Sequence, residues 1–276
     1  MRVSAKSLPT YVGLLVLLFL AAYPVIFMIA NALKDGLQYS ANPLTFGLAY
    51  PVGRFFVTAW AYLAPAFVRT AIITGVSVVG VVAFSMLSAY AFARINFFGR
   101  IFLFYAVFGL LLVPAFLTLI PLVLDIRHYG LLNSYFGLIL PYVAGGQAFA
   151  IFVFRGFIEG LPAELFEAAR VDGAGELYQF LRIVLPLSVP IMITIALLNV
   201  TGFWGDYVFP SLIMSVSNST VAMAIGNFQP PPSIVSVNVV DLQFAAYTLA
   251  SIPMILLFLF FMRYFVAGIT SGAIKM

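Results

Sequence analysis

The chain has 276 residues, of which 64% are hydrophobic and only 8% charged, and its mean hydropathy is +1.13. A soluble domain of this length needs polar side chains over its surface, so this composition excludes one. The apolar runs are far longer than the strands of a membrane barrel, which leaves a helical integral membrane protein. The net charge of +4 is small and spread through loops, so it indicates membrane orientation rather than a nucleic-acid-binding patch. The absence of cysteine excludes disulfides and thiolate chemistry.

Charged residues fall at the edges of the apolar runs and divide the chain into six expected membrane spans. Each run has at least the roughly 20 residues that a helix needs to cross a bilayer. The expected spans are Tyr11–Leu33, Ala71–Ala93, Ile101–Leu124, Tyr129–Phe154, Ile183–Gly205 and Leu242–Met262. An even number of spans places both termini on the same side of the membrane.

The distribution of Lys and Arg predicts which side that is. With the termini inside, nine of the 13 basic residues lie in inner segments and four in outer ones, so cytoplasmic termini are favoured. An alternative for the first span is a cleaved signal peptide, because Arg2 and Lys6 precede it and the sequence 30–32 resembles a cleavage site. Its apolar run is too long for a usual signal core, so we expect a membrane anchor in the cell membrane.

In the second expected span, small residues recur at helical spacing. Ser77, Ser85, Ala89 and Ala93 lie four or eight residues apart, and Val81 occupies the remaining step. A stripe of small side chains lets membrane helices approach one another closely. The stripe therefore predicts the packed face of this helix.

Residues Glu159–Pro190 form the one long polar interruption deep inside the apolar chain, and they hold five of its nine acids. The pattern predicts two short helices with a glycine turn between them. Pro162 suits a first helical position and Glu164 the first turn. We expect Gly173 and Gly175 to adopt left-handed conformations in the turn. A helix–turn–helix joining two spans is a surface for contact with a partner.

Polar groups at membrane depth are neutral, and no acid or base sits in the middle of any span. This counts against a proton-coupled carrier. Asn199, Gly202 and Asp206 lie at spacings of three and four and so share a helix face. Candidates for a translocation path are Gln147, Asn199, Gly202, Phe203, Trp204 and Asp206. Amides and aromatic rings suit a neutral hydroxylated solute, while hydrogen bonding between helices is the alternative interpretation.

Catalytic and metal chemistry find little support. No phosphate-binding loop of the form G-x-x-x-x-G-K-[ST] exists, and Lys6, Lys34 and Lys275 are the only lysines, so ATP hydrolysis on this chain is not expected. A metal site needs several convergent ligands, whereas His128 is the single histidine. We therefore expect no catalytic residue, metal or bound cofactor.

The expected outer loop Ser215–Val240 is uncharged and contains three consecutive prolines at 230–232. Such a stretch is stiff and extended, so it can project from the membrane as a contact loop. A disordered connector is the alternative.

The expected hairpin at Glu159–Pro190 contains a sequence motif that resembles one in a known protein family. Glu167, Ala168 and Ala169 are followed after three residues by Gly173, after nine more by Ile183, and after one more by Leu185 and Pro186. This EAA-x3-G-x9-I-x-LP pattern resembles the signature loop of permease subunits of binding-protein-dependent ABC importers. Its wider context, with the closing segment Gly268–Lys275, is similar to the carbohydrate branch, in particular the shorter six-span partner of maltose-type systems. The likeness covers about Arg69 to Met276.

The resemblance implies an all-α membrane protein with the type I ABC importer permease fold. Residues 1–65 would form the first transmembrane helix and outer loop, 66–270 the transmembrane domain with a coupling loop at about 159–186, and 271–276 a cytoplasmic tail. The first hairpin helix would be a coupling helix in a groove of a separate ATPase subunit. The expected coupling residues are Leu165, Phe166, Glu167, Ala168, Ala169, Asp172, Gly173 and Ala174. ATP and Mg would bind to two such ATPase subunits, not to this chain.

The resemblance also implies a second, homologous permease, an extracytoplasmic solute-binding protein and alternating access for a sugar. Contacts to the binding protein are expected from Asn227, Phe228, Gln229, Pro230, Pro231, Pro232 and Ser233. In that subfamily the partner permease can hold most sugar contacts, so the role of Asn199 stays open. The competing hypotheses are the same architecture importing a glycerophosphodiester, polyol or amino acid, and a membrane scaffold or lipid enzyme without transport.

Overall fold

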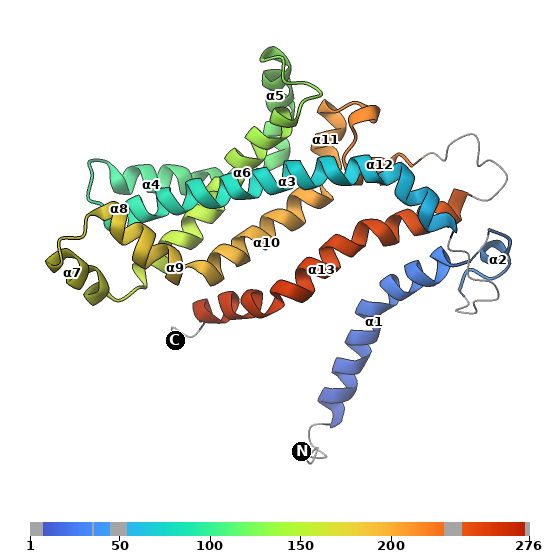
Figure 1. Cartoon of the computed structure of the whole chain (residues 1–276), viewed down its shortest axis with the longest axis horizontal. Helices are drawn as coiled ribbons and strands as arrows, with labels where there is room; N and C mark the ends of the chain where they lie inside the picture. Colours follow the sequence, from blue (N-terminus) through green and yellow to red (C-terminus); the bar gives the residue numbers. More distant parts are fainter. Residues whose placement is uncertain (1–7, 35, 45–53, 229–238, 274–276) are drawn as a thin grey trace. The chain divides into compact units, whose positions relative to one another are not determined.

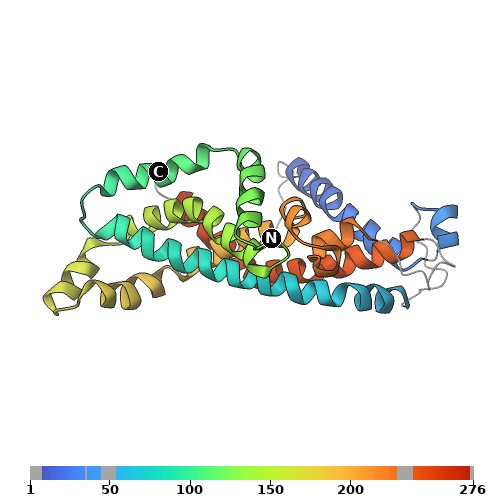
Figure 2. The ribbon, with the colours of Figure 1, turned by 90° about the horizontal axis from the view of Figure 1, so that it is seen from above.

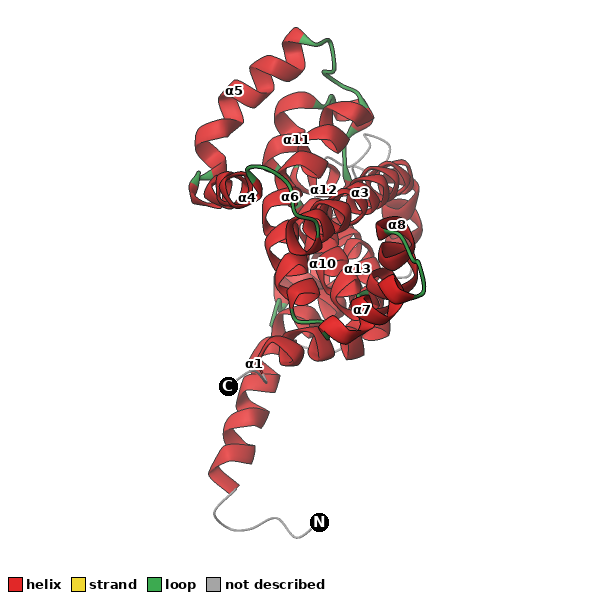
Figure 3. Cartoon of the chain, turned by 90° about the vertical axis from the view of Figure 1, so that its left-hand side faces the viewer, coloured by secondary structure: helices red, strands yellow, loops and turns green. Residues whose placement is uncertain are grey.

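The computed structural model describes residues 8–34, 36–44, 54–228 and 239–273. Within these ranges the regular elements are all helices, joined by loops, and no strand is present (Figure 3). The predicted all-α class is confirmed.

Among the described residues, four helices are long and apolar enough to cross a membrane. They are α1 (Leu8–Ala32), α3 (Arg54–Arg94), α6 (Tyr135–Glu159) and α13 (Val239–Ala273). Two further candidates are bent pairs, and counting each pair as one span gives six, the number that the sequence predicts.

The first bent pair joins α4 (Arg100–Gly109) to α5 (Ala115–His128) through the short 3-10 helix η2 (Leu110–Leu112). Its two parts lie at 99° to one another, and Figure 2 shows this turn clearly. Val113 is extended, and Pro114 after it lacks an N–H group for a helical hydrogen bond. The single straight span expected over this run is therefore broken at Pro114.

The second bent pair runs from α8 (Glu176–Gln179) to α10 (Val189–Gly205), with a bend of 72°. Between them lie the π-helix η3 (Phe180–Val184) and the short α9 (Leu185–Leu187). Pro186 and Pro190 cannot donate backbone hydrogen bonds, and the helix breaks between them at Ser188. The sequence places an interruption at these prolines, and the structure adds a widened turn before it.

The described chain forms two compact units. One comprises the described residues up to 67 and those between 224 and 253, and the other comprises residues 68–223 and 254–273. Both α3 and α13 contribute to each unit. The hairpin and the polar residues of α6 and α10 belong to the second unit, so the candidate sites can be described within it.

In the first unit, Lys34 fixes the chain just after α1. Its ammonium group donates hydrogen bonds to Asn31 Oδ1 at 2.9 Å and to the carbonyl oxygens of Asn42 at 3.2 Å and Pro43 at 3.4 Å. The side chain is buried, and this burial lowers the pKa of Lys34. The lysine therefore joins the last turn of α1 to the residues that follow α2 (Gly36–Ala41).

In the second unit, α3, α6 and α10 pack through small residues. Ser77, Val81, Ser85 and Ala89 are fully buried, which confirms the predicted packing stripe of α3 up to Ala89, while Ala93 at its end is half-buried. The close approach of α6 to α3 also depends on Gly146 of α6, because a Cβ added there would lie 2.6 Å from a methyl group of Val81. Membrane helices that pack on small residues in this way gain van der Waals contact between their backbones.

Candidate functional site

The first candidate site is the hairpin made by α7 (Ala163–Val171) and α8. It lies beside the end of α3 that leads into α4 (Figure 1). Pro162 is the residue before the helix rather than its first member, because its ψ of 131° is not helical. Glu164 lies in the first turn, as predicted, where its carboxylate faces the positive end of the helix dipole.

The turn between the two helices is a Schellman motif. The N–H of Ala174 donates to the Ala169 carbonyl at 2.9 Å, and the N–H of Gly173 donates to the Arg170 carbonyl at 3.0 Å. Gly173 is left-handed with a φ of 78°, as predicted. The same prediction was wrong for Gly175, whose φ of −71° and ψ of 169° are extended. Gly175 directly precedes α8, and the residue before a helix adopts extended backbone.

The exposed face of α7 differs in part from the one expected. Glu167 and Ala168 are exposed, and Leu165 is 42% exposed. Phe166 is only 1% exposed and packs inside the chain, so it supports the hairpin rather than offering surface to a partner. Val171, which the sequence reasoning missed, is 88% exposed. Its spacing of three residues from Ala168 was the available signal, because such residues share a helix face.

The remaining coupling candidates lie around the same turn. Ala169 is half-buried, Asp172 is exposed, and Ala174 is half-buried. Together with Leu165, Glu167 and Gly173 they present a mixed apolar and acidic surface outside the expected spans. That surface is suited to a groove with apolar walls and basic groups.

The first arm of the hairpin is held by Arg94, the last residue of α3. Its guanidinium carbon lies 3.9 Å from the centre of the Phe166 ring, in a cation–π contact. The Nη2 atom also donates to the carbonyl oxygens of Ile158 at 2.8 Å and Leu161 at 3.0 Å. One side chain thus joins the ends of α3 and α6 to the start of α7.

The second arm is held by Tyr90, one helical turn earlier in α3. Its hydroxyl donates to the carboxylate of Glu176 at 2.5 Å, and its ring lies 5.3 Å from that of Phe180. Gln179, which is buried, donates to the Ala174 carbonyl at 2.9 Å and so closes the turn. The sequence reasoning missed these residues, because nothing local relates Tyr90 to a partner 86 positions away.

The second candidate site is the polar face of α10. Asn199 donates to the Ile195 carbonyl of its own helix at 2.9 Å, and its Oδ1 lies where a side chain on Gly146 would meet it, at 2.9 Å. Asp206 accepts a hydrogen bond from the Tyr142 hydroxyl of α6 at 2.8 Å. Asn199 and Asp206 both lie against α6, whereas Gly202, the third residue expected on this face, is exposed. This geometry favours the alternative of contact between helices.

The other path candidates surround this contact. Phe203 stacks on the Tyr142 ring with centroids 4.4 Å apart, and Trp204 is half-buried. Gln147 donates to the Val143 carbonyl at 3.0 Å, one turn earlier in α6. Gly202 is exposed, and nothing lies within 4 Å of a Cβ added to it. The assignment of these residues to a path stays a prediction.

Replacing Tyr142 by phenylalanine tests what the Asp206 contact contributes. We expect a loss of about 1–3 kcal/mol in stability, because the carboxylate keeps its charge but loses its donor. Thermal unfolding of the detergent-solubilised protein measures this loss. Tyr135→Phe, at the start of the same helix, is the matched control and should leave the unfolding temperature unchanged. Equal temperatures for the two variants would contradict a stabilising role.

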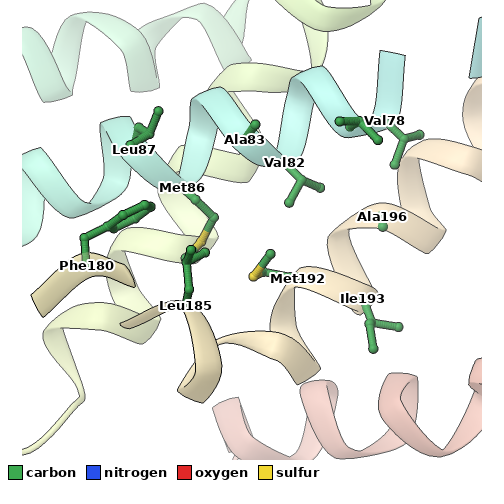
Figure 4. A pocket seen from close by; sticks show the side chains of 11 residues that line it. Val78, Val82, Ala83, Met86, Leu87, Phe180, Leu185, Met192, Ile193 and Ala196 are labelled. Atoms are coloured by element: carbon green, nitrogen blue, oxygen red, sulfur yellow. The ribbon is translucent and has the colours of Figure 1, made fainter. Parts of the chain in front are cut away.

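An apolar pocket of about 510 Å³ lies between α3 and the η3–α10 segment (Figure 4). Met86 and Val82 of α3 face Phe180, Leu185 and Met192 across it. All the side chains that line it are apolar. A hydroxylated solute needs hydrogen-bond partners in its site, so this pocket does not suit a sugar.

The expected binding-protein loop is only partly described. Phe228 is buried, and its ring meets that of Tyr62 at 5.0 Å in an edge-on contact within the first unit. Asn227 is exposed beside it. The remaining residues of the expected contact, Gln229, Pro230, Pro231, Pro232 and Ser233, lie outside the described residues.

The helical spans and the exposed hairpin between two of them define a polytopic membrane component built to contact other proteins. Comparison with known families makes this specific. A model of the family described as binding-protein-dependent transport system inner membrane component matches residues 81–271, and the chain belongs to that family.

Curated relatives extend the likeness over nearly the whole chain. It is 32% identical over 268 residues to the probable ABC transporter permease protein YurM of Bacillus subtilis, covering 96% of this chain and 87% of that one. It is 36% identical over 226 residues to the melibiose/raffinose/stachyose import permease protein MelC of the same organism, covering 80% of each. The arabinooligosaccharides transport system permease protein AraQ of Halalkalibacterium halodurans is 29% identical, with 96% and 95% covered.

A solved structure has the same fold. It is a chain of a bacterial ABC transporter involved in the import of the acidic polysaccharide alginate. The TM-score is 0.81 with 22% sequence identity, and the match covers 96% of this chain and 99% of that one. The expected ABC importer permease fold is thereby confirmed.

Proposed function

We propose that this chain is the permease subunit of an ATP-driven importer for a neutral sugar or oligosaccharide. Membership of the binding-protein-dependent family supports the assignment of the chain to an importer. Relatives named for melibiose, raffinose, stachyose and arabinooligosaccharides support a saccharide as the transported solute. The saccharides in these names are uncharged, which supports a neutral cargo.

The proposed assembly contains this chain, a second homologous permease, two ATPase subunits and an extracytoplasmic solute-binding protein. Both termini and the α7–α8 hairpin face the cytoplasm in this arrangement. The excess of Lys and Arg in the inner segments supports the orientation. The binding protein docks on the opposite face, near the loop at 227–233, and releases its solute into a path between the two permeases.

ATP and Mg bind to the ATPase subunits in this proposal, and the membrane chain supplies position and movement. The exposed surface of α7 fits a groove in one of the two ATPases, where Glu167 offers a charge and Leu165 and Val171 offer apolar contact. Closure of the ATPases on ATP moves the hairpin and switches the path from inward-open to outward-open. ATP hydrolysis then returns the path to the inward-open state.

One observation carries the proposal above the others. The EAA-x3-G motif occupies an exposed helix that ends in a left-handed Gly173 and lies between two spans. A helix at that place has no need of an exposed acidic and apolar face unless a partner covers it. The alternative of a helix that lies on the lipid surface is disfavoured, because anionic headgroups repel its acidic side chains.

The test is uptake by the reconstituted complex with its binding protein in proteoliposomes. The panel contains radiolabelled raffinose, arabinotriose, glycerophosphocholine and glutamine. We expect uptake of one or more saccharides that requires both ATP and the binding protein, and background uptake of the others. Uptake of only glycerophosphocholine or glutamine would reject the sugar assignment. Saccharide uptake without ATP would reject the coupling to an ATPase.

A further inference from the structure

The two contacts that hold the hairpin end on a single turn of α3. Tyr90 and Arg94 are four residues apart, so they lie on one face of the helix. Tyr90 binds the second arm through Glu176 at 2.5 Å, and Arg94 covers Phe166 of the first arm at 3.9 Å. Both arms are thus tied to the same place on one membrane helix.

The hairpin between these two contacts is closed by its own hydrogen bonds. The Schellman turn joins Ala174 to Ala169, and Gln179 reaches back to the Ala174 carbonyl at 2.9 Å. These bonds oppose separation of α7 from α8. A displacement of α7 is therefore carried to α8 and, through both contacts, to the end of α3.

The chemistry of the contacts makes them directional. A hydroxyl that donates to a carboxylate forms a charge-assisted hydrogen bond, which is stronger than a neutral one and sensitive to geometry. The guanidinium of Arg94 also donates to the two carbonyl oxygens at the end of α6, Ile158 and Leu161. Its position is therefore fixed by α6 as well as by the Phe166 ring. Burial of apolar side chains alone would permit sliding at this joint.

We propose that Tyr90 and Arg94 are the positioning residues through which movement of the hairpin is passed to α3. This inference rests on the proposed function, because it assigns the joint between an ATPase-docking surface and a membrane helix. The Tyr90–Glu176 bond transmits force from the second arm, and the Arg94–Phe166 contact transmits it from the first. Neither side chain needs to touch the solute or the nucleotide.

The experiment uses the reconstituted complex and the variants Tyr90→Phe and Glu176→Gln, singly and together. Tyr90→Phe removes the donor of the bond, whereas Glu176→Gln leaves a neutral acceptor in place of the charged one, each with little change in volume. We expect solute transported per ATP hydrolysed to fall about tenfold in Tyr90→Phe, on the order of the loss of one hydrogen bond to a charged group, and by less in Glu176→Gln. ATPase retention and unstimulated hydrolysis should remain unchanged. The double variant should be no worse than Tyr90→Phe alone, because that single variant already removes the interaction that Glu176→Gln weakens.

The control is Tyr105→Phe, the same chemical change at an exposed tyrosine of α4, which should transport normally. Normal transport per ATP in Tyr90→Phe would overturn the inference. So would additive losses in the double variant, because these would show that the two side chains act separately.

A parallel variant separates failure of the inference from failure of the proposed function. Glu167→Arg reverses a charge on the docking surface and should release the ATPase. If it does so while Tyr90→Phe transports normally, the proposed function stands and the inference about Tyr90 and Arg94 is wrong. If Glu167→Arg also retains the ATPase and transports normally, the proposed function is wrong.

Discussion

Replacing Gly173 by proline is expected to abolish both ATPase retention and solute uptake. Gly173 has a φ of 78°, whereas the proline ring holds φ near about −65°. The substitution also removes the N–H that donates to the Arg170 carbonyl in the Schellman turn. The turn must therefore open, and α7 can no longer present its exposed face in register. Co-purification of the ATPase with the affinity-tagged permease measures the loss directly.

The neighbouring Gly175 provides a matched control. Its φ of −71° is accessible to every residue, and an added Cβ would meet nothing within 4 Å. Gly175→Ala should therefore bind the ATPase and support uptake as the unaltered chain does. Retention of the ATPase by Gly173→Pro would show that the turn does not position the docking surface. Loss in both variants would show that the region is generally intolerant, and the argument from φ would fail.

Replacing Gly146 by alanine is expected to disrupt the contact of α6 with α3 and α10. The new Cβ would lie 2.6 Å from Val81 Cγ2 and 2.9 Å from Asn199 Oδ1, and real side chains do not approach so closely. Overpacking of this kind costs about 1–3 kcal/mol. A loss of about 2 kcal/mol lowers the unfolding temperature of a chain of this size by roughly 4–8 °C. Thermal unfolding in detergent measures the shift.

The adjacent Gly145 faces open space, with nothing within 4 Å of an added Cβ. Gly145→Ala should leave the unfolding temperature unchanged or raise it slightly, because glycine is about 0.5–1 kcal/mol less favourable than alanine inside a helix. The two substitutions are chemically identical and one position apart. Equal unfolding temperatures would therefore contradict the close approach of the three helices.

Several features of this protein follow from the amino-acid sequence alone. The composition requires a helical membrane protein, and the charges at the edges of the apolar runs divide it into six candidate spans. The EAA-x3-G motif marks the hairpin and its left-handed Gly173. Each of these features is set by the composition of the chain or by residues close together in the sequence. Local chemistry is therefore sufficient to predict them.

Only the tertiary structure decided which way the side chains of these helices face. Phe166 is buried under Arg94 while Val171 is exposed, and Asp206 lies against Tyr142 rather than open space. In a membrane helix both the lipid-facing and the protein-facing sides are apolar, so hydrophobic periodicity does not distinguish them. The pairing of Tyr90 with Glu176 likewise depends on how α3 packs beside a distant hairpin. Contacts between residues far apart in the chain are set by that packing, which no short stretch of sequence encodes.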